Sequence, residues 1–206
     1  MPRILRRLPY IHETNRPQLL AGRARRRQIM LHVGIAPLAQ PSESAEVPPP
    51  TIRAIPLVLD TGFTHSLLLR QSHLRHLTLT PTVSYRDSDF RLTGRNVDLI
   101  RRRTPAAAVA GSEQVSVPTR YARLWFYPNI TGSWEIDSKA EPTFMRSSSE
   151  LIIAPSDDLT PSGMASPLFG LGGINDCDLF TLAYAGHLDL WTGRPWWWRF
   201  LRPFIR

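Results

Sequence analysis

The ten residues from Leu57 to Ser66 restrict the fold of this chain more than any other stretch. An apolar run, Leu57-Val-Leu59, ends directly at Asp60, and a glycine follows two residues later. Such a run is typical of a buried strand, which would deliver Asp60 to its end. Gly62 would let the backbone turn sharply there and lie close to a bound molecule. We therefore predict a strand that presents one carboxylate in a glycine turn.

The length and the distribution of charge indicate one domain with basic ends. The 206 residues are 42% apolar, which is enough for one packed core. Residues 1–27 contain eight Arg and one Glu, residues 194–206 contain four Arg and no acid, and residues 28–193 contain 13 basic and 16 acidic side chains. We expect a basic flexible arm at 1–27, a folded domain at 28–193 and a Trp/Arg-rich tail at 194–206. No nucleic-acid motif accompanies the charge, so no nucleic-acid partner is expected.

Cysteine usage and hydropathy predict a cytoplasmic protein. Cys177 is the only cysteine, so an internal disulfide is excluded and a reducing compartment is favoured. The first 30 residues lack the continuous apolar stretch of a signal peptide. No run approaches the roughly 20 apolar residues that cross a bilayer.

The remaining pattern predicts a mainly β fold. Strands are expected at Gln28–Ile35, Thr51–Leu59, Thr78–Tyr85, Tyr121–Tyr127 and Glu150–Ala154. Pro56 within the second of these suggests a sheet edge or a bulge. Residues 128–149 are polar and turn-rich, which indicates an insertion. In Ala106–Val117, two strand-capable arms flank Ala110-Gly-Ser112 and Glu113, a pattern typical of a hairpin. This hairpin is either an ordinary surface feature or a flap that closes over a peptide, with Gly111 near its tip.

A second motif lies near the C-terminus. Leu168 and Phe169 are followed by Gly170, and residues 174–178 could form a helical turn. Leu179–Tyr184 and His187–Trp191 then alternate like a closing hairpin around Ala185-Gly186.

The two motifs together resemble the pattern of retropepsin-like aspartic proteases, of a bacterial-type branch. The resemblance covers roughly Gln28–Trp191 and rests on the apolar lead-in, Asp60-Thr-Gly62, Ser66, and the later Leu168-Phe169-Gly170. It implies a small closed acid-protease barrel with one short helix after Gly170, as the single-domain protomer of a homodimer. It implies no cofactor and no metal.

The resemblance also implies roles for individual residues. Asp60 would be catalytic, and Thr61 and Gly62 would belong to the same catalytic loop. Substrate would contact the loop and the flap, through Phe63, Thr64, Ala110, Gly111 and Ser112. Structural support would come from Ser66, Leu168, Phe169 and Gly170. In this family the glycine lets its strand pass tightly behind the active-site loop.

An aspartic endopeptidase needs two carboxylates that share one proton, because close like charges do not both ionise cheaply. The sequence holds no second Asp-Ser/Thr-Gly, so each chain would supply one Asp60 to a dyad on a twofold axis. Two alternatives remain open. The same fold could be an inactive dimerisation or peptide-binding module. Alternatively, the motif is accidental in a basic-tailed protein that binds nucleic acid or membranes.

Several other patterns carry less weight. His65, His73 and His76 lack the neighbouring ligands that a metal site needs, so surface histidines are the better interpretation. Gly170-Leu-Gly-Gly173 lacks the third glycine of a dinucleotide loop and is followed by too short a chain. A thiol dyad of Cys177 with His187 is less favoured than a buried cysteine.

The C-terminal tail is rich in large apolar and basic side chains. Residues 191–206 hold four of the six Trp and four Arg. Such a segment packs on its own domain, crosses to a partner subunit or lies on an anionic membrane surface. We favour the partner subunit narrowly, because catalysis already requires a dimer.

Overall fold

The computed structural model describes residues 3–11, 28–38, 47–80, 82–101, 113–127, 141–142, 144–155, 167–184 and 187–192. The fold is mainly β, as predicted. The strands are β1 Arg3–Ile11, β2 Gln28–Ala36, β3 Ala54–Asp60, β4 Leu67–Arg70, β5 Leu92–Arg101, β6 Glu113–Tyr127, β7 Phe144–Ala154, β8 Leu168–Gly170, β9 Leu179–Tyr184 and β10 His187–Thr192. The described residues add two short helices, α1 Gln71–Leu74 and α2 Leu171–Asp176, and a 3-10 turn, η1 Asp87–Asp89.

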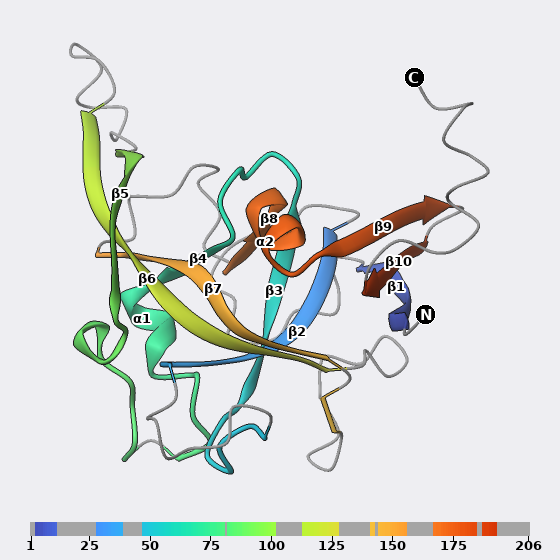
Figure 1. Ribbon diagram of the computed structural model, residues 1–206, viewed down its shortest axis with the longest axis horizontal. Helices are drawn as coiled ribbons and strands as arrows, with labels where there is room; N and C mark the ends of the chain where they lie inside the picture. Colours follow the sequence, from blue (N-terminus) through green and yellow to red (C-terminus); the bar gives the residue numbers. More distant parts are fainter. Residues whose placement is uncertain are drawn as a thin grey trace.

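Six of the strands close into a barrel, which confirms the predicted architecture. Their order is β6-β7-β4-β8-β3-β2, and β2 pairs again with β6 to complete the ring (Figure 1). Most neighbours are antiparallel, but β3 runs parallel to β8 and β4 runs parallel to β7. The parallel pair β3–β8 brings the two sequence motifs side by side.

Two extensions leave this ring. The hairpin of β5 and the first half of β6 rises from the barrel as a two-stranded ribbon (Figure 1). Its arms pair from Leu92–Arg120 to Arg101–Glu113. The predicted upstream arm at Ala106–Val109 lies outside the described residues. Residues 102–112 connect the arms and lie outside the described residues.

The second extension is a strand at residues 3–11, within the predicted flexible arm, while residues 12–27 of that arm lie outside the described residues. Arg3–Ile11 forms β1, which pairs with β10 along most of its length and with β2 at Tyr10–Ile29 and Ile11–Gln28. The high arginine content suggested a flexible arm, but Ile, Leu and Tyr lie between the charged residues of this segment, and Ile and Tyr favour strands. The predicted closing hairpin is present as β9 and β10, and it lies beside β1 at one side of the barrel (Figure 1).

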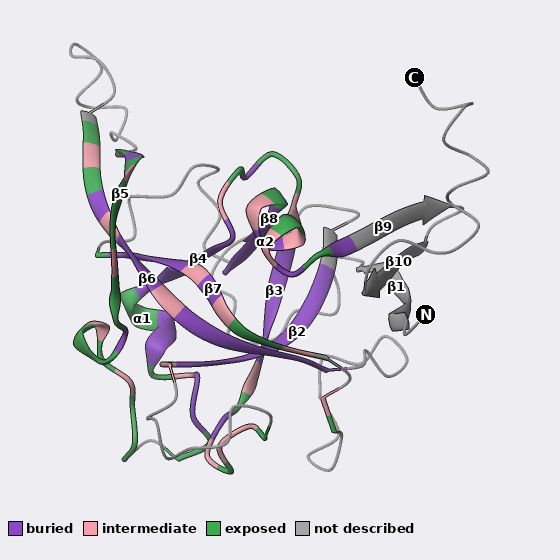
Figure 2. Cartoon of the chain, viewed as in Figure 1, coloured by how far each residue is buried: buried purple, intermediate pink, exposed green. Residues whose placement is uncertain are grey.

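Two apolar clusters explain why the sequences of several strands are continuously apolar rather than alternating between apolar and polar residues. The inner cluster fills the barrel and takes residues from all six ring strands, among them Leu31, Leu57, Leu67, Phe126, Leu151 and Phe169. The outer cluster covers the opposite face of β2, β3, β4, β7 and β8, and comprises Met30, Val58, Phe63, Leu68, Leu99, Val117, Ile152, Ala154 and Leu168. Strands buried on both faces have no polar side, as Figure 2 shows for β2 and β3.

Other boundaries differ from the sequence-based predictions. Thr78–Tyr85 is not a strand and contributes only an isolated bridge from Thr78 to Ile52, although Pro81 lies outside the described residues. Phe144–Ser149, placed in the predicted insertion, belongs to β7, since Phe144, Met145, Arg146 and Ser149 pair with residues of β6. The sequence analysis did not predict the short helix α1. Pro56 lies in an interior strand, but β8 pairs with β3 only from Val58 onward, so Pro56 has one neighbouring strand rather than two.

Candidate active site

Asp60 occupies the last position of β3, where its strand meets β8. Its register partner there is Gly170, which confirms the predicted proximity of the two motifs. The Asp60 carboxylate is half-buried, and its Oδ1 accepts a hydrogen bond of 2.9 Å from the backbone N–H of Gly62. Among the described residues no basic side chain is paired with it. The carboxylate is therefore oriented by the turn.

The turn after Asp60 is fixed by backbone hydrogen bonds to the second motif. Within the loop, the N–H of Phe63 donates to the carbonyl of Asp60 at 3.1 Å. Across to the second motif, the N–H of Leu171 donates to the carbonyl of Phe63 at 2.8 Å, and the N–H of Gly170 donates to the carbonyl of Ser66 at 2.9 Å. The loop from Asp60 to Ser66 and the start of α2 therefore form one rigid unit.

The approach of these two segments requires glycine. A Cβ atom on Gly170 would lie 2.3 Å from the carbonyl oxygens of both Phe63 and His65. A Cβ on Gly172 would lie 2.6 Å from the carbonyl carbon of His65, and one on Gly173 would lie 2.6 Å from the ring of Phe169. The tight passage of Gly170 agrees with the expectation from the resemblance. The need for Gly172 and Gly173 went unnoticed, because the sequence offered only a weak dinucleotide pattern there.

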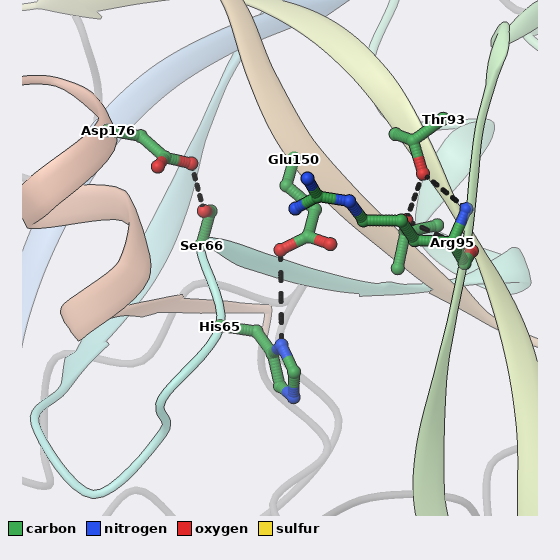
Figure 3. Close-up of polar contacts among 7 residues, drawn as sticks. His65, Ser66, Thr93, Arg95, Glu150 and Asp176 are labelled. Carbon is green, nitrogen blue, oxygen red and sulfur yellow. Dashed lines mark hydrogen bonds and ion pairs between the residues drawn. The ribbon is translucent and has the colours of Figure 1, made fainter.

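Ser66 connects the loop to α2. Its side chain is 1% exposed, and its hydroxyl donates a short hydrogen bond to Asp176 Oδ2, 110 residues away in the sequence (Figure 3). This contact places Ser66 in the supporting role predicted for it. Asp176 was missed, because nothing local to it in the sequence marks a partner so distant along the chain.

The predicted substrate-binding residues of the loop separate into two groups. Thr61, Gly62 and Thr64 are exposed at its tip, where they are open to a second molecule. Phe63 is 3% exposed and packs in the outer cluster, and both its backbone N–H and its carbonyl are hydrogen-bonded. Its assignment as a substrate contact stays a prediction. Phe63 is a core residue that anchors the loop under the β5–β6 hairpin.

The supporting residues of the second motif are buried as expected. Leu168 lies in the outer cluster and Phe169 in the inner one, and both have 0% exposure. The ring of Phe169 meets that of Phe126 edge to face at 5.6 Å. Ala110, Gly111 and Ser112, the predicted flap residues, lie outside the described residues.

A charged group beside the loop was also missed. His65 Nδ1 lies 3.9 Å from Glu150 Oε2, and both side chains are about a third exposed (Figure 3). The His65 ring also lies 5.5 Å from the ring of Phe63. The sequence analysis considered His65 only together with His73 and His76 as a possible metal ligand, whereas in the structure His65 lies near the carboxylate of Glu150 on β7.

The described residues contain no cluster of His, Cys, Asp and Glu that could hold a metal ion. His73 is buried, and its Nδ1 accepts a hydrogen bond from the N–H of Arg70 at 3.1 Å, so it is not a surface histidine as predicted. The pKa of His76 is lowered by burial and by the nearby Arg75 and Arg53. Burial raises the pKa of the Cys177 thiol to about 12, so it is a protonated core residue rather than a nucleophile.

Comparison with protein-family models, curated proteins and solved structures finds no match for this chain. The two described helices span four and six residues, and neither is long and apolar enough to cross a membrane.

Proposed function

We propose that this protein is an aspartic endopeptidase of retropepsin-like type, active as a homodimer with Asp60 of each subunit in a shared dyad. The observation that supports it is the placement of Asp60. It ends a buried strand, lies directly opposite Gly170, and is held in a loop that the glycine segment fixes from behind. A carboxylate held in this way needs little reorganisation when it binds a reacting group.

The chemistry requires a second carboxylate, and a second copy of the chain supplies it. One Asp60 accepts a proton from a bound water as that water attacks the carbonyl carbon of the peptide bond. The other Asp60 donates its proton to the carbonyl oxygen, which gives a tetrahedral diol. The first Asp60 then passes the proton that it took from water to the amide nitrogen, the C–N bond breaks, and the second Asp60 recovers a proton from a hydroxyl of the diol, so that an amine and a carboxylic acid leave. The exposed residues of the loop tip, Thr61, Gly62 and Thr64, and the exposed Leu171 leave this surface open to a partner. A cytoplasmic site of action belongs to the proposal and rests on the single cysteine.

The substitution Asp60→Asn tests the proposal, because it removes both members of the dyad without changing side-chain size. Full-length protein is incubated with a mixture of peptides, and products are detected by mass spectrometry. We expect Asp60→Asn to abolish cleavage while sedimentation shows the same dimer. The matched control is Asp178→Asn, which removes an exposed carboxylate in the turn after α2 and should cleave at the wild-type rate. Cleavage by Asp60→Asn at that rate would refute the mechanism.

A mixing experiment separates a shared site from two independent ones. If each site needs both carboxylates, exchange of wild-type with Asp60→Asn subunits in equal amounts should leave about a quarter of the activity. Independent sites would leave about half.

The rate should also rise on the acid side of neutrality, where the dyad holds one proton. A rate that is constant from acid to alkaline pH would argue against a carboxylate dyad. A wild-type dimer that binds peptides but never cleaves them would favour the inactive binding module.

A further inference from the structure

A polar cavity of about 240 Å³ lies beside the active-site loop. Its walls come from the base of the β5–β6 hairpin, from β7 and from the end of α2. The lining residues are Thr93, Arg95, Tyr121, Arg146, Ser148, Ser149, Glu150 and Asp176. The cavity therefore joins three elements that are far apart in the sequence.

Two contacts connect this cavity to the loop that carries Asp60. Asp176 accepts the hydrogen bond from Ser66, and Glu150 lies 3.9 Å from His65 (Figure 3). Both loop residues follow Asp60 within six positions. The cavity therefore adjoins the loop that carries Asp60.

The groups that line the cavity differ in how far their bonding capacity is used. Asp176 is engaged by Ser66, Glu150 faces His65, and Arg146 Nε donates to the carbonyl of Ser148 at 3.2 Å. Arg95 uses its backbone N–H, which donates to Thr93 Oγ1 at 3.1 Å. Its guanidinium extends from β5 toward Glu150, and no hydrogen bond or ion pair with another described residue engages it (Figure 3). The largest unused donor capacity in the cavity is therefore that of Arg95.

The chemistry of Arg95 selects one kind of ligand. A guanidinium presents several N–H donors in a planar fork that matches a carboxylate. An apolar side chain in the same place would displace water from the cavity, and the guanidinium donors and the nearby hydroxyls would then have no hydrogen-bond partners. A basic side chain would approach the guanidinium groups of Arg95 and Arg146, and Asp176 Oδ2 is already engaged by the hydroxyl of Ser66.

We propose that this cavity is a specificity pocket that binds an acidic side chain of the peptide substrate through Arg95. The inference rests on the proposed peptidase function and names its substrate class. Because the dimer has twofold symmetry, each subunit contributes one such pocket. Acidic residues should therefore favour cleavage at two positions, one on each side of the scissile bond.

The test uses peptides in which a single Glu or Gln is moved through each position around one cleavage site. We expect a Glu peptide to have a kcat/KM about fivefold above its Gln counterpart at the matching positions, the upper range for a solvent-exposed ion pair. In Arg95→Gln this ratio should fall to about one, while the urea midpoint stays unchanged. The matched control is Arg91→Gln, which removes an exposed guanidinium on the same segment outside the cavity and should keep the preference.

Failure of this pocket and failure of the proposed function give different results. If wild-type protein cleaves peptides with no Glu preference, with a Lys preference, or with a Glu preference that survives in Arg95→Gln, the pocket assignment is wrong and the peptidase stands. If nothing is cleaved, binding of fluorescent Glu and Gln peptides to Asp60→Asn protein is measured by anisotropy. Tighter binding of the Glu peptide that is lost in the Asp60→Asn, Arg95→Gln double variant then supports the pocket without the peptidase. Equal binding of the two peptides overturns the pocket as well.

Discussion

Gly170→Ala should destabilise the protein strongly, because the added methyl group meets backbone on two sides. Its Cβ would lie 2.3 Å from the carbonyl oxygens of Phe63 and His65, whereas Cβ atoms almost never come closer than 3.0 Å to other atoms. The loop and β8 must separate, which costs about 1–3 kcal/mol by overpacking alone. Separation also weakens the bonds from Gly170 N–H to Ser66 and from Leu171 N–H to Phe63, each contributing about 0.5–1.5 kcal/mol.

Together these terms predict a loss of about 3 kcal/mol in the free energy of unfolding, or a fall in Tm of about 10 °C for a chain of this length. Urea unfolding followed by fluorescence measures the first quantity and a thermal scan the second. The control is Gly62→Ala in the exposed turn, where the nearest contact of the new Cβ is 3.2 Å to Asp60 Oδ1. We expect it to lose less than about 1 kcal/mol, as is usual for exposed positions. If Gly170→Ala unfolded at the same urea concentration as the wild type, the close packing of loop and glycine segment would be refuted.

The remaining predictions concern the buried thiol and the C-terminal tail. Burial raises the pKa of Cys177 from 9.0 to about 12, so the stability that its neutral thiol contributes is complete below pH 9 and is lost as the pH rises toward 12. Urea midpoints across this range should therefore fall more steeply in the wild type than in Cys177→Ala, and parallel curves would contradict the burial of an uncharged thiol. Truncation after residue 193 removes the Trp/Arg-rich tail, which lies outside the described residues, and should give an inactive monomer by sedimentation. A truncated protein that stays dimeric and active but no longer binds anionic vesicles would assign the tail to a membrane surface instead.

Local patterns in the sequence carried much of the fold. Three patterns reflect local preferences of the backbone. They are the apolar run before Asp60, the glycine after Phe169 and the alternation in the β9–β10 hairpin. These preferences predicted a mainly β fold and the position of Asp60 at a strand end, whereas the closed barrel and the proximity of Asp60 to Gly170 were implied by the resemblance to retropepsin-like proteases. The structure has all four features.

Features that depend on distant contacts were not predictable in this way. The pairs Ser66–Asp176 and His65–Glu150 join residues about a hundred positions apart, and neither partner has a local signal. Strand β1 pairs with β10, which lies near the other end of the sequence. Because this pairing has no local signal, the positive charge of the segment led to the prediction of a flexible arm. The burial of Phe63 in the outer cluster was not foreseen either, because it follows from tertiary packing, which a motif does not encode.

The most direct test of the central claim is the distance between the two Asp60 carboxylates in a crystal structure of the homodimer. The account predicts that their nearest oxygens lie on the twofold axis about 2.6–3.2 Å apart, within hydrogen-bonding distance, as a dyad that shares a proton requires. A dimer that holds the two carboxylates far apart on separate faces would contradict it.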